Sequence, residues 1–247
     1  MTLADEVTAQ LDRLLTDVAD DATRAHWERY MKGTAAFRGV PMAGIRKVVR
    51  CLWKEHHLGD RPTDELLALA QRWFARRDSE DKLAAVLLIA EHLVDRLELR
   101  HHAALAHPLE VGNIADWGVC DWYANKALHG YLTEADDERE SRARAIAAWT
   151  HTDRLWQRRA GLVAFVRLAP LADRQFDGFI PLVLDACAAN LVSDDRFAHT
   201  GPGWVLRELS KAAPEAVAEF VESHPELSAE GRRMATARLR PGKYRRR

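Results

Sequence analysis

The sequence predicts an all-α fold, because apolar residues recur at helical spacing along the whole chain and no run of alternating β-branched residues interrupts them. Its abundance of Ala, Leu, Arg and Glu also favours helices. Apolar helix centres fall near positions 48, 86, 122, 160 and 206, at steps of about 35 to 45 residues, the period of helix-pair solenoids of the HEAT type. We therefore predict an α-solenoid of degenerate HEAT-like helix-pair repeats, a single domain over 1–247 with a concave binding face.

The individual helices are predicted from apolar stripes and from residues that favour helix starts. Apolar stripes predict the first helices, over 3–15, 22–31 and 42–52. Residues that favour N-termini predict the starts of further helices, at Thr63, Ser79, Asp153, Pro214 and Ser228. The Gly-Pro-Gly run at 201–203 predicts a tight turn where the helix of Trp204 begins.

Composition excludes several classes of protein. An apolar fraction of 47% and a charged fraction of 30% fit a soluble globular chain. The longest apolar run, at 84–90, is far too short to cross a membrane, and the acidic, amphipathic start does not resemble a secretory signal. Three widely spaced cysteines fit a reducing compartment. We expect a cytoplasmic, nucleoid-associated protein that does not bind membranes and is a monomer.

The charge is unevenly distributed. The tail at about 232–247 carries eight basic and no acidic residues, and because the whole chain has a net charge of −1, the remainder has −9. Such a tail is either a solvated chain end or an arm that contacts phosphates.

The stretch from Ile114 to Leu132 carries the strongest sign of a binding site. Trp117 and Asp121 are four residues apart, so in a helix an indole and a carboxylate share one face. An aromatic surface beside a fixed negative charge suits a flat cationic ligand such as an alkylated nucleobase. Two later tryptophans, Trp156 and Trp204, each have arginine within one helical turn, and arginine suits phosphate.

Structural roles compete with these interpretations. Asp121 could accept hydrogen bonds between helices, and Arg159 could form a salt bridge between repeats. Trp122 and Trp156 are expected in the core. The histidine pairs at 56–57 and 101–102 are expected at solvated helix ends, and neither a CxxC pair nor an HExxH helix is present, so we expect no metal and no cofactor.

Four motifs in order along the chain resemble those of the AlkD-type DNA alkylation repair proteins, a family of HEAT-like DNA glycosylases. The first is RYMKGTAAFRGVPMAGIRKVVR (29–50), similar to the family's tyrosine-containing helix and FxGV turn. DWGVCD (116–121) is similar to its tryptophan-to-aspartate motif. DRLWQRRAGLVAFV (153–166) and RFAHTGPGWVLRELSKAAPEAVAEFV (196–221) resemble its W-x-x-R segment and its C-terminal GWVLRE signature.

The resemblance implies roles for the matched residues. Asp121 corresponds to the catalytic carboxylate, and Tyr30, Trp117 and Trp204 to aromatic residues that line the cleft around the lesion. Arg159 matches the arginine that holds a nearby backbone phosphate. Arg158, its neighbour, is the alternative for that role, and the resemblance makes Arg207 a further phosphate contact.

The implied activity is excision of cationic N3- or N7-alkylated purines from double-stranded DNA, by hydrolysis of the N-glycosidic bond. The positive charge already makes the base a good leaving group, and a carboxylate stabilises the charge that develops on the deoxyribose. The alternative is a catalytically silent HEAT-like module that binds damaged or branched DNA or a protein partner.

Overall fold

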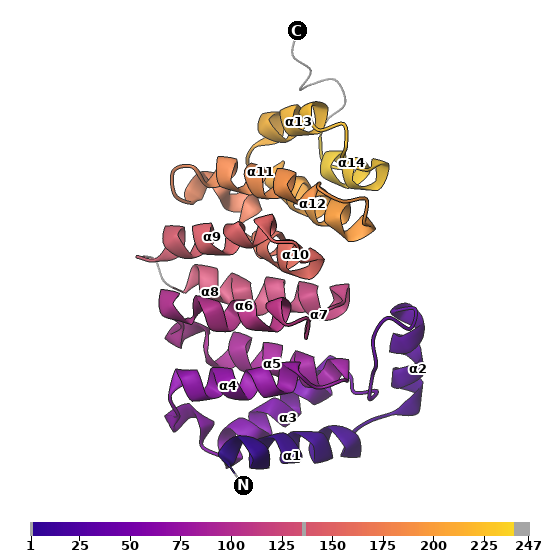
Figure 1. The fold of residues 1–247 in the computed structure, drawn as a ribbon, viewed down its shortest axis with the longest axis vertical. Helices are drawn as coiled ribbons and strands as arrows, with labels where there is room; N and C mark the ends of the chain where they lie inside the picture. Colours follow the sequence, from indigo (N-terminus) through magenta and orange to yellow (C-terminus); the bar gives the residue numbers. More distant parts are fainter. Residues whose placement is uncertain (1, 135–136, 240–247) are drawn as a thin grey trace. The chain divides into compact units, whose positions relative to one another are not determined.

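A computed structural model describes residues 2–134 and 137–239, so the last eight residues of the basic tail lie outside the described residues. The described residues form helices and no β-strand, apart from an isolated bridge between Ala36 and Asp78 (Figure 1). The prediction of an all-α fold is confirmed. The helices group into two compact units, Met1–Glu134 and Ala135–Arg247, which we describe separately.

Unit 1 is built around one helix whose middle segment is apolar all round. Its α-helices are α1 (Leu3–Asp17), α2 (Asp21–Tyr30), α3 (Met42–Glu55), α4 (Thr63–Phe74), α5 (Ser79–His92), α6 (His102–Glu110), α7 (Trp117–Trp122) and α8 (His129–Thr133). Every side chain from Ala84 to Ile89 of α5 is buried, as expected of a helix that is apolar all round. The helices α3, α4 and α7 pack against it.

Helix α2 is an exception, because none of its residues is buried. In Figure 1 it stands apart from the other helices of unit 1 and runs across their direction. Its N-terminus is held by a close backbone contact, in which Asp20 donates its N–H to the carbonyl of Gly39 at 2.9 Å. Gly39 has a φ of +99°, and a Cβ there would lie 2.1 Å from the Asp20 carbonyl oxygen, so only glycine fits.

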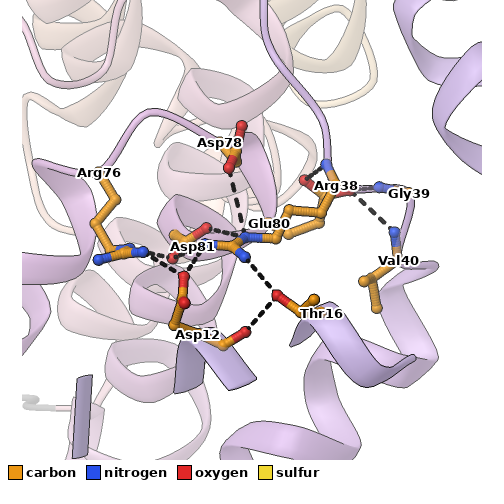
Figure 2. A network of polar contacts seen from close by, with 9 residues as sticks. All are labelled: Asp12, Thr16, Arg38, Gly39, Val40, Arg76, Asp78, Glu80 and Asp81. Carbon is orange, nitrogen blue, oxygen red and sulfur yellow. Dashed lines mark hydrogen bonds and ion pairs between the residues drawn. The ribbon is translucent and has the colours of Figure 1, made fainter. Parts of the chain in front are cut away.

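The segment that follows α2 is fixed by a buried polar network (Figure 2). Glu80, on the first turn of α5, accepts the backbone N–H groups of Arg38, Gly39 and Val40 at 2.9, 2.8 and 3.0 Å. The Arg38 guanidinium in turn donates to the buried Asp81 at 2.6 Å. Because α2 buries nothing of its own, these contacts set its position.

Arg38 also joins this network to α1, where it donates to Asp12 at 2.7 Å. That hydrogen bond is the main reason why the pKa of Asp12 lies below its ordinary value. Burial alone would lower the pKa of Arg38, but its hydrogen bonds to Asp81 and Asp12 outweigh burial and raise it. Arg38 therefore stays charged and clamps three segments of unit 1 together.

The stretch from Ile114 to Leu132 is helical from Trp117 onward but is not one regular helix. Between α7 and α8 lies a π-helical turn, η4 (Tyr123–Leu128). The wide turn packs against α5, and the hydroxyl of Tyr123 donates to the carbonyl of Leu105 at 2.7 Å. Turns of this kind occur mostly as single insertions in α-helices, frequently at functional sites.

Unit 2 contains α9 (Arg139–Ala148), α10 (Leu155–Val163), α11 (Phe179–Asn190), α12 (Arg196–Leu209), α13 (Pro214–Ser223) and α14 (Ala229–Thr236). Consecutive helices pack in pairs, α9 with α10, α11 with α12 and α13 with α14, as expected of helix-pair repeats. The predicted starts at Pro214 and Ser228 are confirmed, and the Ser228 hydroxyl caps α14 by accepting from Gly231 N at 3.2 Å.

Two expectations for unit 2 are wrong. Gly201, Pro202 and Gly203 lie inside α12 rather than in a turn before it. Gly203 is needed for packing, because a Cβ there would lie 2.7 Å from the carbonyl oxygen of Gly231 on α14. The second error concerns Asp153, because Arg154 is the N-cap of α10 and no side chain caps that end.

The expected core positions of two tryptophans are also wrong. Trp122 and Trp156 are both half-buried. Trp122 lies under the ammonium group of Lys126 at 5.6 Å, and Trp156 meets the ring of Phe197 at a centroid distance of 5.1 Å. Both side chains therefore cover helix surfaces instead of filling the interior. No helix in the described part of the chain is long and apolar enough to cross a membrane.

Candidate functional site

Two aromatic residues of the predicted site meet in unit 1. Tyr30, the last residue of α2, and Trp117, the first of α7, contact each other edge to face with ring centroids 5.4 Å apart. Next to them, Met31 is buried against Gly118, where a Cβ would lie 3.2 Å from Met31 Cε. This apolar contact fixes the end of α2 to the start of α7 and leaves the Tyr30 side chain 55% exposed.

The aromatic surface extends beyond the predicted residues. The imidazole of His26 stacks on the ring of Tyr30 at 6.4 Å, and Trp27 meets Tyr30 edge to face at 5.7 Å. Trp27 in turn stacks on Phe37 at 6.2 Å. We call His26, Trp27, Tyr30, Phe37 and Trp117 the aromatic cluster. Sequence analysis missed three of its members, although the spacing of His26 and Trp27 from Tyr30 by four and three residues already placed them on one helical face.

Asp121 lies one helical turn after Trp117 on α7, as the spacing predicted, and its side chain is half-buried. The side-chain amide of Asn125 donates to the backbone carbonyl of Asp121 at 3.0 Å. The π-helical turn begins two residues later, at Tyr123. The backbone of Asp121 is therefore held by a hydrogen bond from the side chain of Asn125.

A second carboxylate, that of Asp116, directly precedes Trp117 in the sequence. Asp116 caps α7 by accepting the Val119 N–H at 2.9 Å, and its side chain is buried. Burial raises its pKa, and the negative charge of Asp121 acts in the same direction, whereas Lys82 opposes it. Burial also lowers the pKa of Lys82, whose ammonium donates to the carbonyl of Asn113 at 2.7 Å. Asp116 fixes the start of α7, and so the position of Trp117.

In unit 2, Arg159 reaches from α10 to α12. Its Nη1 donates to the Phe197 carbonyl and to the Thr200 hydroxyl, each at 3.3 Å, and its guanidinium lies over the Phe197 ring at 5.5 Å. Only 5% of Arg159 is exposed. Trp204 follows Thr200 by one turn on the same helix and is half-buried. Arg159 of α10 therefore contacts α12, the helix that carries Trp204.

Arg158 leaves α10 toward a different neighbour. Its Nη1 donates to the carbonyl of Thr152 at 3.0 Å, and the side chain lines a cleft of 620 Å³ within unit 2. Arg207 remains partly exposed, and its Nε donates to the carboxylate of Glu208 at 3.0 Å. Glu208 also pairs with Arg238, at the end of the described residues. The two adjacent arginines of α10 thus belong to different environments.

The histidines differ in part from expectation. His101 is not at a solvated helix end, because only 2% of it is exposed and its Nδ1 accepts the backbone N–H of Glu98 at 2.8 Å. The reason is local, since this bond closes a short capping turn before α6. Among the described residues no group of histidines, cysteines and carboxylates has the geometry of a metal site.

Comparison with known proteins assigns the family. The family model described as DNA alkylation repair enzyme matches residues 11–239, which cover most of both units. The chain belongs to this DNA alkylation repair enzyme family. Membership gives it a role in the repair of alkylated DNA and implies that it binds DNA.

A solved structure of a predicted DNA alkylation repair enzyme from Enterococcus faecalis has the same fold, with a TM-score of 0.75. The two chains are 21% identical, and the likeness covers 90% of this chain and 97% of the other. No curated protein matches the sequence.

Proposed function

We propose that the protein is a DNA glycosylase that excises cationic N3- or N7-alkylated purines from double-stranded DNA. The observation that carries this proposal is the contact of Tyr30 with Trp117, with the Asp121 carboxylate one helical turn further along the same helix. Electron-rich ring faces and a fixed negative charge are what a flat cationic base and a cationic sugar require.

The reaction breaks the bond between the sugar carbon C1′ and the base nitrogen. The bonding electron pair goes to the base, whose positive charge it neutralises, so the base leaves without being protonated. Positive charge then develops on the deoxyribose, where the carboxylate of Asp121 stabilises it. Water adds to C1′ and gives up one proton, which the carboxylate of Asp121 accepts.

The aromatic residues supply binding to the cationic lesion. Tyr30 is exposed enough to present a ring face, and such a contact contributes about 0.5–2 kcal/mol when the partner is cationic. Within unit 2, Trp204 supplies an aromatic surface of its own. Because the positive charge on the base is lost as the bond breaks, these contacts favour the damaged base over both the normal base and the product.

The arginines supply contacts with the phosphate backbone. Arg159 takes the main phosphate contact, with its guanidinium already oriented by Thr200 and Phe197. Arg207 is a weaker contact because it is partly neutralised by Glu208. Phosphate contacts of this kind fix register along the DNA without reading its sequence.

The direct test is single-turnover release of base from a duplex with one N7-methylguanine, with the protein in excess and the free base quantified by chromatography. The proposal predicts release well above the spontaneous rate, and none from the same duplex with an ordinary guanine. Binding to the damaged duplex without any accelerated release would instead support a catalytically silent DNA-binding module.

A further inference from the structure

The first turn of α5 holds the segments that lead to both rings of the Tyr30–Trp117 contact. Glu80 binds the backbone of the segment that follows α2, the helix that ends at Tyr30. Lys82, two residues further along α5, donates from Nζ to the backbone carbonyl of Asn113 at 2.7 Å. Asn113 lies shortly before Trp117, which begins α7. One helical turn therefore anchors the approaches to both rings.

The segment that leads into α7 has little regular structure of its own. Residues 111–116 form turns and bends rather than a helix. Ile114 is fully buried, and its N–H donates to the carbonyl of Pro108 at 3.0 Å. Asp116 caps the first turn of α7. The hydrogen bond from Lys82 ties this segment to α5, the central helix of unit 1.

The positive charge of Lys82 calls for a second explanation, because a carbonyl needs only a donor. The side chain is half-buried, and burial lowers its pKa. Asp116 is the carboxylate that opposes this lowering most. Asp78 and Asp81 oppose it more weakly, and both already pair with Arg38, at 3.5 and 2.6 Å. The ammonium of Lys82 therefore compensates mainly the charge of Asp116.

Asp116 needs this compensation because its surroundings disfavour its charged form. Burial raises its pKa and the nearby charge of Asp121 adds to the effect, whereas Lys82 opposes both. An ionised carboxylate is a stronger acceptor for the N–H groups at a helix start than a neutral one, and it also interacts favourably with the helix dipole. A cation that keeps Asp116 ionised thus strengthens the cap of α7.

We propose that Lys82 is a positioning residue that holds Trp117 against Tyr30. It does so by binding the Asn113 carbonyl and by supporting the ionised cap of Asp116. Its effect on base excision rests on the proposed glycosylase function, whereas its effect on the ring contact needs no substrate.

The test uses the full chain and two NMR measurements without DNA. These are the nuclear Overhauser effects between the rings of Tyr30 and Trp117, and the titration of the side-chain carboxyl carbon of Asp116. We expect Lys82→Met to weaken the Overhauser effects and to move the titration of Asp116 to higher pH, because the opposing cation is lost. Lys82→Arg keeps the charge and should restore both. Lys47→Met removes a positive charge from an exposed position on α3 and should change neither.

Single-turnover release of N7-methylguanine adds a kinetic measurement. Lys82→Met should slow release about tenfold, because a displacement of about 1 Å in a site can cost up to about 10²-fold, and Lys82→Arg should recover most of the loss. If Lys82→Met fails to fold, Lys82→Gln, which keeps a donor and loses the charge, replaces it.

Three results would each overturn the proposal: an unchanged ring contact, an unchanged titration of Asp116, or an unchanged rate of release in the uncharged variant. Absence of any release by the unaltered protein would count against the glycosylase function instead, and the two NMR measurements would then decide the role of Lys82.

Discussion

The ring of Tyr30 meets the ring of Trp117 edge to face at 5.4 Å, although Tyr30 ends a helix that buries no side chain of its own. The contact therefore depends on what holds the two ends of α2. At the C-terminal end of α2, Met31 packs against Gly118. At the N-terminal end, Asp20 donates to the carbonyl of Gly39, whose own N–H is bound by Glu80. The exposed ring of Tyr30 is therefore carried by a helix that is anchored at both ends, and we call this helix, α2, the arm.

Replacing Tyr30 with alanine should weaken binding of the alkylated base, and so slow its excision at subsaturating protein about fivefold, because a cation–π contact of about 1 kcal/mol with the cationic base is lost. Stability should change by less than about 0.5 kcal/mol, since the side chain is mostly exposed. Single-turnover kinetics and thermal unfolding give the two quantities. Tyr30→Phe keeps the ring and should retain most activity. Equal losses in Tyr30→Ala and Tyr30→Phe would show that the hydroxyl, not the ring face, is what the site uses.

Loss of the Glu80 carboxylate should loosen the arm. In Glu80→Gln the amide nitrogen must face one of the three N–H groups that Glu80 now accepts, so a buried donor loses its partner. We expect a loss of about 1.5–3 kcal/mol in the free energy of unfolding, together with faster hydrogen exchange at Gly39 and Val40.

The matched control for Glu80 is Glu91→Gln, which removes a carboxylate from a more exposed pair with Arg46 and should cost less than about 1 kcal/mol. Unaltered exchange at Gly39 and Val40 in Glu80→Gln would mean that this carboxylate does not hold the arm.

Arg159→Ala should weaken binding to duplex DNA of any sequence and lower the salt dependence of the affinity by about one counterion. Titrations at several salt concentrations measure both. Because Arg159 is buried against α12, Thr200→Val serves as a control that removes one internal hydrogen bond and keeps the charge. A parallel salt dependence in Arg159→Ala and the unaltered protein would assign Arg159 to internal packing alone.

Neutral lesions should be poor substrates. The candidate site offers rings and a carboxylate, and the histidines that could protonate a leaving base are His26, in the aromatic cluster, and His129, which begins α8. Without a positive charge, uracil or 1,N6-ethenoadenine loses both the cation–π contact and its quality as a leaving group. A panel of duplexes, each with one lesion, tests this. Comparable excision of a neutral lesion that disappears in His129→Gln would identify that histidine as an acid.

The sequence predicts much of the fold because local signals agree with tertiary packing in most helices. The apolar stripe of α3 and the predicted start of a helix at Ser79 correspond to observed helices. The Gly-Pro-Gly run in α12 misleads because Gly203 allows close contact with α14 and Gly201 faces α10, which only the folded chain reveals. Asp153 fails as a cap because α10 begins one residue later than predicted, with Arg154 at the N-cap position.

The candidate site is less visible in the sequence. The four-residue spacing places Trp117 and Asp121 on α7, but nothing local predicts that α2 brings Tyr30, with His26 and Trp27 packed on it, to Trp117. That arrangement depends on long-range bonds to Glu80. The separate environments of Arg158 and Arg159 follow from helical geometry, because adjacent residues lie about 100° apart around a helix.

The central claim, that Asp121 stabilises the transition state of base excision, is tested most directly by single-turnover kinetics of Asp121→Asn with a duplex carrying one N7-methylguanine. The carboxylate acts on charge present only in the transition state, so we expect excision to slow by about 10²–10³-fold, or about 3–4 kcal/mol, with DNA affinity nearly unchanged. An unchanged rate of excision in Asp121→Asn would contradict the catalytic assignment.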